Sequence, residues 1–158
     1  DAPSAVTRLL DLGVPHYLIQ STLTGVVAQR LVRTLCPHCK EKAAQDPDEW
    51  RVLTHGFALP PPAEVCRPVG CLECRHTGFL GRTGIYEMLN LSSRLRGMIG
   101  ADFDLGRFGL EAGREGLQPL RISAAHQVAA GLTSVQEVLT VLPPIETPES
   151  ASAPPDPT

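Results

Sequence analysis

Apolar residues near the start of the chain recur at helical spacing. Ser4 precedes them as a candidate N-cap, and Gly13 follows them as a candidate C-cap. The apolar positions are Val6, Leu9, Leu10 and Leu12. This pattern predicts a helix between Ser4 and Gly13. Pro15 can start a second helix, because its fixed backbone angle suits the first turn.

Two segments far apart in the sequence have the composition of strands. Residues 25–33 mix valines with arginines, although a short buried helix gives a similar pattern. Residues 81–89 follow a glycine-rich turn and include Ile85 and Tyr86. We expect the two segments to pair antiparallel, so that the sequence between them is an insertion between partner strands.

The sequence of this insertion predicts one short helix and a long loop. Asp46, Pro47 and Asp48 can open the helix, which would run through Trp50 and Leu53. The three consecutive prolines at residues 60–62 then force an extended conformation.

The chain after Asn90 is predicted to be helical as far as residue 142. The expected helices are one capped by Ser92, one at residues 104–115, and one at residues 119–130 that ends at Gly131. Thr133 is the predicted N-cap of a last helix, with Gln136 and Glu137 in its first turn. Residues 143–158 are mostly Pro, Ser, Glu and Thr, and we expect them to be disordered.

Composition and charge narrow the possible functions. The chain has 158 residues, is 42% hydrophobic and carries a formal net charge of −3. A balance this close to neutral argues against a protein built mainly to bind nucleic acid. No apolar run approaches the roughly 18 residues of a membrane span, so a membrane location would have to come from a partner. The chain begins with Asp1 and not with Met, and we expect it to belong to a longer protein.

Two C-x-x-C pairs give the clearest chemical signal. They are Cys36-Pro37-His38-Cys39 and Cys71-Leu72-Glu73-Cys74. Four thiolates in two such pairs can close a tetrahedral zinc shell. The count of five cysteines is odd, which disfavours a disulfide framework. The sequence therefore predicts a structural zinc site with Cys36, Cys39, Cys71 and Cys74 as ligands.

Three other side chains near the pairs are weaker candidates for the metal. His38 and His76 could each replace a cysteine, but a closed four-cysteine shell leaves them as neighbouring or surface residues. Cys66 lies outside the C-x-x-C rhythm, and we expect it to be a small buried apolar residue. A zinc hydrolase would need an open ligand position, which four cysteines do not leave.

The sequence contains no P-loop. That motif needs a lysine after a glycine, and Lys40 and Lys42 are the only lysines here. The chain alone is therefore not expected to hydrolyse ATP by that route. Arg82 sits in a glycine-flanked turn, where it could point at a phosphate or carboxylate or simply be a solvated strand-end residue. Arg30 and Arg33 could each line a subunit or nucleotide interface, or be ordinary exposed charges.

Several stretches together resemble one known family. The stretches are residues 5–14, 28–39, 70–87 and 131–139. They look like the C-terminal part of the type II secretion and type IV pilus assembly ATPases, the general secretion pathway protein E family. The resemblance covers about residues 4–142 and is specific in the order and spacing of its motifs.

The resemblance implies an α+β fold that ends a RecA-like α/β core. The implied parts are a tail of that core at residues 1–35, an inserted zinc-binding lobe at 36–78, a returning core strand at 79–90, a small helical C-terminal subdomain at 91–142 and a disordered tail at 143–158. Zinc would be structural, and ATP and Mg²⁺ would bind mostly upstream of this chain.

The resemblance also implies a role for the parent protein. It would be a cytoplasmic homo-hexamer that hydrolyses ATP to drive protein secretion or pilus assembly. It would lie at the inner face of the bacterial inner membrane through platform partners, which the tetracysteine lobe is expected to meet. Arg82 looks like a family arginine that points toward the nucleotide, and Arg30 is a second candidate. Retraction-type relatives generally lack the tetracysteine insert, so its presence favours the assembly or secretion branch.

The sequence departs from the family pattern at two places. Ser123-Ala124 stands where the family often has Asp-Gly, and Thr140 stands where an arginine is common. These departures leave open which secretion or pilus system the protein serves. The alternative function is a zinc-ribbon nucleic-acid-binding domain, which the near-neutral charge and few aromatics disfavour. Its phosphate contacts would be Lys40, Lys42, Arg67 and Arg75.

Overall fold

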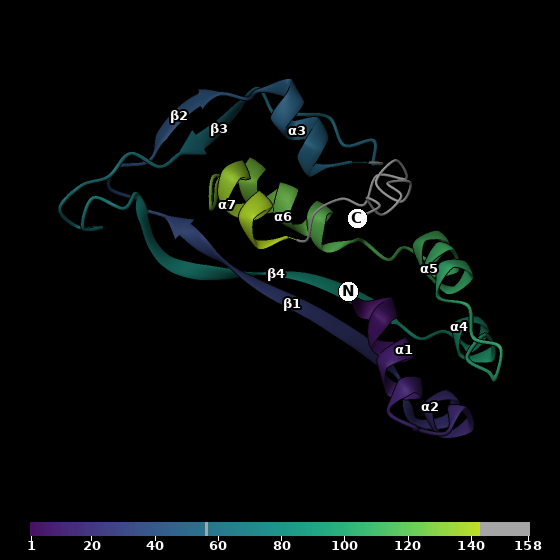
Figure 1. Ribbon diagram of the computed structural model, residues 1–158. Helices are drawn as coiled ribbons and strands as arrows, with labels where there is room; N and C mark the ends of the chain where they lie inside the picture. Colours follow the sequence, from purple (N-terminus) through teal and green to yellow (C-terminus); the bar gives the residue numbers. More distant parts are fainter. Residues whose placement is uncertain (56, 143–158) are drawn as a thin grey trace, which may run out of the picture.

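A long antiparallel ribbon of two strands is the spine of the molecule. The structure is a computed structural model that describes residues 1–55 and 57–142. Strand β1 (Gly25–Leu35) pairs with β4 (Phe79–Asn90), with Gly25 opposite Asn90 and Arg33 opposite Arg82. Figure 1 shows α6 and α7 beside the middle of this ribbon and α1, α2, α4 and α5 toward one of its ends. The fold is mixed α+β, and the predicted pairing of residues 25–33 with 81–89 is confirmed.

Four helices build a hydrophobic cluster at one end of the ribbon. They are α1 (Ala2–Asp11), α2 (His16–Thr22), α4 (Ser93–Gly97) and α5 (Leu105–Arg114). Their core includes Val6, Ile99 and Phe108, all with no exposed surface, and Leu89 of β4. The long ribbon therefore supplies one wall of this core.

The first helix begins earlier than the sequence predicted. Asp1, and not Ser4, is the N-cap, because the Asp1 carboxylate accepts a hydrogen bond from the Ser4 amide at 2.7 Å. Gly13 follows the helix as expected, with a φ of +83°. Its amide and that of Val14 donate to the carbonyls of Leu10 and Leu9, which satisfies the last turn.

The insertion and the last two helices share a second hydrophobic cluster. The elements are α3 (Pro47–Leu53), α6 (Leu120–Ala129), α7 (Val135–Val141) and a hairpin of β2 (Glu41–Ala44) with β3 (Glu64–Arg67). Trp50 and Leu53 of α3 pack in the same cluster as Val128 and Val138. The sequence predicted α3 but not the hairpin. The insertion therefore has apolar support from the C-terminal helices as well as from its cysteines.

The turn between α6 and α7 closes part of the outer edge of β1. The Leu35 amide donates to the Leu132 carbonyl at 2.8 Å, and the Thr133 hydroxyl donates to the Arg33 carbonyl at 2.9 Å. Because this contact occupies Thr133, the predicted cap at Thr133 is wrong, and Ser134 is the N-cap of α7. The caps Asp46 and Ser92 and the end of α6 at Gly131 agree with the sequence analysis, and Asp104 is the N-cap of the helix expected at residues 104–115. Residues 143–158, which were expected to be disordered, lie outside the described residues.

A buried carboxylate joins the ribbon to two helix N-termini. Glu87 of β4 is 4% exposed, and its Oε1 accepts a hydrogen bond from the Ala2 amide at 2.7 Å. Its Oε2 accepts one from the Leu120 amide at 3.2 Å. The negative charge suits both helix N-termini. Pro119, the N-cap residue of α6, supplies no side-chain bond, so Glu87 takes that place.

We expect Glu87→Ala to lower the free energy of unfolding by about 2–4 kcal/mol, because two amides at helix N-termini lose their buried acceptor. Urea denaturation of the chain measures the effect. Met88→Ala is the matched control, because the neighbouring Met88 side chain is 69% exposed and should change stability little. Equal losses in the two variants would contradict a role for the carboxylate.

Candidate metal centre

Two tight turns at the end of the ribbon carry the cysteines. Cys36 directly follows β1, and its amide donates to the Gly78 carbonyl at 2.9 Å, next to the start of β4. The second turn is closed by a bond from the His76 amide to the Cys71 carbonyl at 2.8 Å. Gly78 has a φ of +78°, and a Cβ atom there would lie 2.5 Å from the Cβ of Pro68. Only glycine fits this position.

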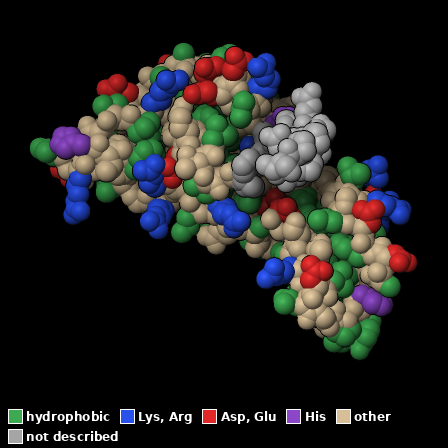
Figure 2. Space-filling view, viewed as in Figure 1, with side chains coloured by type: hydrophobic (Ala, Val, Ile, Leu, Met, Phe, Trp, Pro, Cys, Tyr) green, Lys and Arg blue, Asp and Glu red, His purple; other side chains and the backbone are tan. Residues whose placement is uncertain are grey.

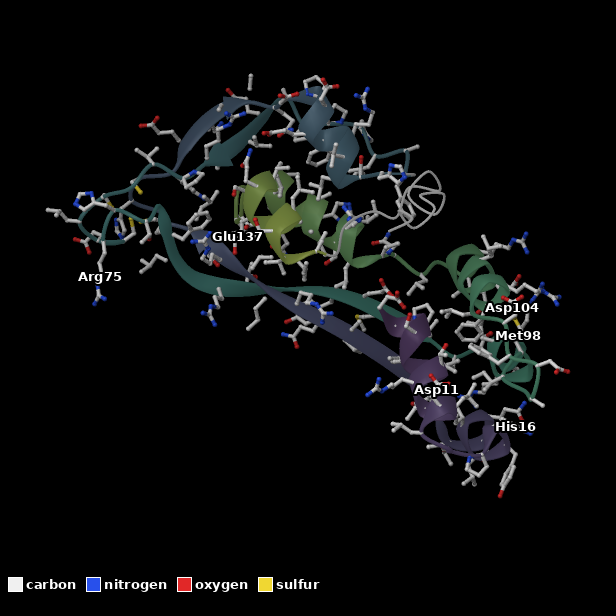
Figure 3. All side chains as sticks on the ribbon, viewed as in Figure 1. Asp11, His16, Arg75, Met98, Asp104 and Glu137 are labelled. Atoms are coloured by element: carbon white, nitrogen blue, oxygen red, sulfur yellow. The ribbon has the colours of Figure 1, made fainter. Side chains whose placement is uncertain are left out.

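The four predicted ligands converge on one point. The sulfur atoms of Cys36, Cys39, Cys71 and Cys74 all lie within 4.8 Å of one another and could hold a metal ion. Three of the Sγ–Sγ separations are 3.9 Å (Cys36–Cys71), 3.8 Å (Cys39–Cys74) and 3.8 Å (Cys71–Cys74). A tetrahedral ion with metal–sulfur bonds of about 2.3 Å separates its ligands by about 3.8 Å. Figure 3 shows these sulfurs, in yellow, at the far end of the ribbon.

Backbone amides point at two of the sulfurs. The Gly70 amide donates to Cys39 Sγ at 3.3 Å, and the amides of Cys71 and Gly78 each donate to Cys74 Sγ at 3.2 Å. Burial raises the pKa of the Cys74 thiol, but these two amide donors outweigh it, and the pKa falls to about 6. Burial raises the pKa of the Cys39 thiol to about 11. The amide donors of the second turn thus stabilise negative charge on the Cys74 sulfur.

The other candidate residues lie outside this cluster. His38 and His76 are both exposed, and within the described residues no histidine joins the group of sulfurs. Cys66 lies on β3 and is half-buried, where the sequence analysis expected a buried residue. Its sulfur faces the end of α6, where it would lie 2.9 Å from a Cβ atom at Gly131. Lys40, between the first turn and β2, donates to the Gly131 carbonyl at 2.8 Å.

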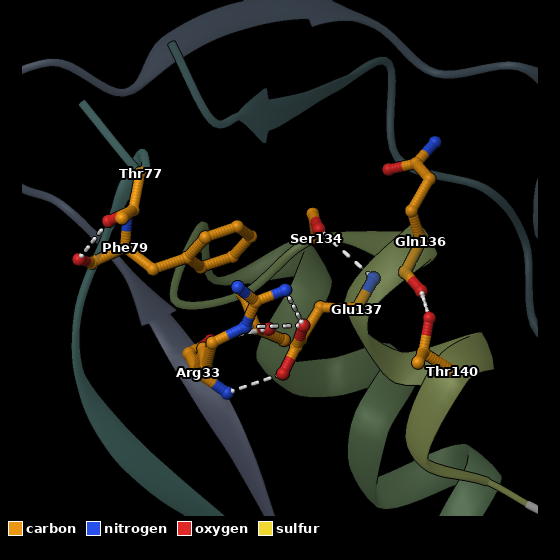
Figure 4. Close-up of polar contacts among 8 residues, drawn as sticks. Arg33, Thr77, Phe79, Ser134, Gln136, Glu137 and Thr140 are labelled. Carbon is orange, nitrogen blue, oxygen red and sulfur yellow. Dashed lines mark hydrogen bonds and ion pairs between the residues drawn. The ribbon is translucent and has the colours of Figure 1, made fainter. Parts of the chain in front are cut away.

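An ion pair that the sequence analysis missed ties α7 to the base of the first turn. Arg33 Nη2 and Nε donate to Glu137 Oε2 at 2.6 and 2.8 Å, and the Arg33 amide donates to Oε1 at 2.9 Å. Figure 4 shows this fork, with the guanidinium stacked on Phe79 at 4.1 Å from the ring centroid. The pair therefore links β1, the start of β4 and α7 at one point.

The sequence held a partial signal for this ion pair. Ser134 and Glu137 have the spacing of a capping box, and the Ser134 hydroxyl accepts the Glu137 amide at 3.2 Å. In that motif the glutamate side chain returns to its own N-cap, whereas here it bonds to β1. Its side chain is only 6% exposed, against 53% for Arg33. Burial raises the pKa of Glu137, but the hydrogen bonds and charge of Arg33 outweigh it and hold the pKa below its usual range.

Arg82 and Arg30, the arginines expected to face a nucleotide, lie on the two strands of the ribbon and are not part of the cysteine cluster. Arg82 is exposed and stands opposite Arg33 across the two strands. Arg30 is exposed and donates to the Gln29 carbonyl at 3.1 Å. Within the described residues neither guanidinium has an acidic partner. Both guanidinium groups can therefore bind an anion from outside this chain.

The fold and the site define a class of protein, and comparison gives the family. A ribbon with a tetracysteine insertion that docks on C-terminal helices is a mixed α+β protein with a candidate metal centre. The family model described as Type II/IV secretion system protein matches residues 1–140. The chain belongs to this family.

Named relatives agree with the family model. The chain is 47% identical over 143 residues to the type IV pilus assembly ATPase TfpB of Acinetobacter baylyi, covering 90% of this chain and 24% of the relative. It is 40% identical over 141 residues to the type II secretion system protein E of Aeromonas hydrophila, covering 89% and 27% respectively. It is 36% identical over 139 residues to the type IV pilus assembly ATPase PilB of Thermus thermophilus, covering 88% and 16%. The chain spans about a quarter of the length of the first two relatives.

Among the helices of residues 1–55 and 57–142, none is both long enough and apolar enough to cross a bilayer.

The Arg33–Glu137 pair predicts a pH dependence. A carboxyl whose pKa is lowered by folding adds stability above its unfolded pKa of about 4.3, and this stability is lost as the pH falls through the folded pKa. We expect Glu137→Gln to cost about 1–3 kcal/mol near neutral pH and progressively less in acid. Denaturant unfolding at several pH values measures the difference between wild type and variant.

The exposed Glu73 provides the control for this test. Glu73→Gln should leave the difference from wild type small at every pH, because it removes no described partner. A Glu137→Gln cost that stays constant from neutral pH to acid would contradict the lowered pKa.

Proposed function

We propose that the chain is the C-terminal, zinc-bearing segment of a hexameric ATPase that powers type II protein secretion or type IV pilus assembly. The observation that carries the proposal is the convergence of four cysteine sulfurs in a chain that the family model matches over residues 1–140. Thiolate ligands at tetrahedral separations suit zinc. The activity proposed for the whole protein rests on what the relatives are called, and this chain covers about a quarter of the length of the first two.

Zinc in this proposal is structural. Four thiolates leave no open ligand position for water or substrate. The ion would cross-link the turn after β1 to the turn before β4, and so fix both ends of the insertion. Cys36, Cys39, Cys71 and Cys74 are its ligands, and the amides at Gly70 and Gly78 support their negative charge.

One face of the ribbon exposes apolar side chains that other parts of the parent protein would cover. The exposed side chains on this face include Val27, Leu31, Tyr86 and Met88, which are 59%, 51%, 45% and 69% exposed. Apolar, two-stranded ribbons are marginal in water unless other elements cover them. We infer that β1 and β4 end a RecA-like core that lies mostly outside this chain. The tetracysteine lobe at residues 36–78 and the helical subdomain at 91–142 would then be appended to that core.

Arg82 and Arg30 would face ATP in the assembled hexamer. ATP and Mg²⁺ would bind mainly to parts of the protein outside this chain, since the chain lacks a P-loop. Exposed guanidinium groups without acidic partners are suited to charge stabilisation at phosphate. The parent protein would be cytoplasmic and would act at the inner face of the inner membrane with platform proteins of the secretion or pilus system.

Metal content tests the zinc site. The chain purified under reducing conditions should hold about one zinc ion, and Cys36→Ser and Cys71→Ser should each lose it. Cys66→Ser is the matched control and should keep the metal, because Cys66 lies outside the cluster. A wild-type chain without zinc, or a Cys66→Ser variant that loses zinc, would refute this ligand assignment.

ATPase assays on the full-length protein test the arginines. Arg82→Ala should lower kcat by about 10- to 1000-fold, as expected when a charged donor at a phosphate is removed. Arg51→Ala is the control, because Arg51 is exposed and pairs only with Asp48 within α3. If both variants turn over ATP at the wild-type rate, Arg82 does not face the nucleotide.

A further inference from the structure

The turn that joins α6 to α7 lies against the base of the metal centre. We call residues 131–137, which are this turn and the start of α7, the α6–α7 corner. Figure 1 shows α6 and α7 between the β2–β3 hairpin and the ribbon, and α6 contacts β3 while α7 contacts β1. Figure 2 shows that the end of the molecule with the cysteine turns is continuous with this body of insertion and helices. The corner is therefore placed to contact the segments that enter and leave the cysteine turns.

The corner holds the first cysteine turn on both sides. The amide of Leu35, directly before this turn, donates to the Leu132 carbonyl at 2.8 Å. The ammonium group of Lys40, directly after this turn, donates to the Gly131 carbonyl at 2.8 Å. Two consecutive carbonyl groups of the corner thus fix the two ends of the turn that supplies the first pair of sulfurs.

The corner also contacts the segments on both sides of the second cysteine turn. Strand β3 leads to that turn, and it packs closely on the corner, because a Cβ atom at Gly131 would lie 2.9 Å from the Cys66 sulfur. Phe79 follows the turn, and its ring stacks on the Arg33 guanidinium. Glu137 of the corner accepts two hydrogen bonds from that guanidinium (Figure 4). All four segments that lead into or out of the cysteine turns therefore contact the corner, directly or through Arg33.

The shape of the corner is fixed by contacts that involve none of the four clustered cysteines. Thr133 has no exposed surface, and its hydroxyl donates to the Arg33 carbonyl at 2.9 Å. Val135 is buried in the hydrophobic cluster of the insertion and the last two helices. Gly131 has a φ of +67°, which a residue with a side chain rarely adopts. The corner can therefore support the cysteine turns from outside the metal shell.

Support of the turns and affinity for a metal ion depend on each other. Four sulfurs bind one ion more tightly when their turns are already held in place, because less conformational entropy is lost on binding. A corner that orders the segments around the turns therefore raises the affinity for the metal. By thermodynamic linkage, the bound metal stabilises the contacts of the corner by the same free energy.

We propose that the α6–α7 corner is the scaffold of the metal centre, so that metal affinity is coupled to the docking of the corner on the ribbon. Lys40 and Thr133 are positioning residues, because they bond to the segments around the turns and not to the metal. The inference rests on the proposed metal centre and is independent of ATP hydrolysis. Loss of the metal loosens the contacts of the corner with β1, whereas α3 keeps its apolar contacts through Trp50 and Leu53.

The zinc affinity of the full-length protein, measured by competition with a chromophoric chelator, tests one direction of the coupling. Lys40→Met and Thr133→Val should each weaken zinc binding about fivefold, since each removes one hydrogen bond of the support. Lys40→Arg keeps the charge and a donor, and its affinity should stay within about twofold of the wild type. Lys42→Met and Thr140→Val are the matched controls and should bind zinc as the wild type does. The Lys42 side chain pairs with Glu64, and the Thr140 hydroxyl bonds within α7.

Hydrogen exchange tests the other direction. Removal of zinc by a chelator should speed the exchange of the Leu35 amide and of the α7 amides by about fivefold or more, because the metal no longer stabilises the corner. The amides of α5, which belongs to the other hydrophobic cluster, should exchange at an unchanged rate. Phe108→Leu in that cluster lowers stability away from the corner and should leave the zinc affinity unchanged.

The possible results separate this inference from the metal centre itself. Wild-type zinc affinity in both Lys40→Met and Thr133→Val, or exchange in α7 that does not change with zinc, overturns the coupling and leaves the metal centre intact. Equal losses of affinity in Lys42→Met or Phe108→Leu also overturn it, because the effect would then come from charge or from general stability. A wild-type protein that holds no zinc overturns the metal centre and this inference together.

Discussion

The antiparallel register of β1 against β4 is the constraint on which the rest of the structure depends. Leu35 pairs with Phe79 at the end of the ribbon, so the chain leaves β1 and enters β4 at neighbouring points. Because the cysteine turns adjoin these points, the pairing places both C-x-x-C motifs side by side before any metal binds. A metal ion then has little loop-closure entropy left to overcome. The strands also give one wall to each hydrophobic cluster.

Two buried glutamates fix the helices to this ribbon. Glu87 bonds to the first residues of α1 and α6, and Glu137 bonds to Arg33 of β1. Each carboxylate lies where a backbone amide or a guanidinium needs an acceptor, so its burial is compensated. The contacts lie at different points along the ribbon, Glu87 toward its helical end and Glu137 beside the cysteine turns. The ribbon is thereby tied to α1, α6 and α7 by directional bonds as well as by apolar packing.

Local sequence signals predicted the elements well, and long-range contacts limited the rest. The pairing of the two strands, the caps at Asp46 and Ser92, and the four clustered cysteines follow from spacing and residue type. The hairpin of β2 with β3 was missed because each strand has four residues and little hydrophobic alternation. Thr133 was mistaken for a cap because its hydroxyl bonds to Arg33, which is distant in sequence. The same distance concealed the partners of Glu87 and Glu137.

The insertion is held by two kinds of interaction that act at different places. The sulfurs of its two cysteine pairs meet at the end of the ribbon, while Trp50 and Leu53 pack on α6 and α7. Trp50 also donates its indole N–H to the Leu59 carbonyl at 2.9 Å, which fixes the long loop. None of these apolar contacts involves a cysteine of the cluster. A metal ion held by the four sulfurs would therefore control the shape of the two turns, whereas burial of Trp50 and Leu53 controls how the insertion sits on the C-terminal helices. The affinity of a partner that binds the two turns would depend on the metal, whereas the affinity of a partner that binds α3 would not.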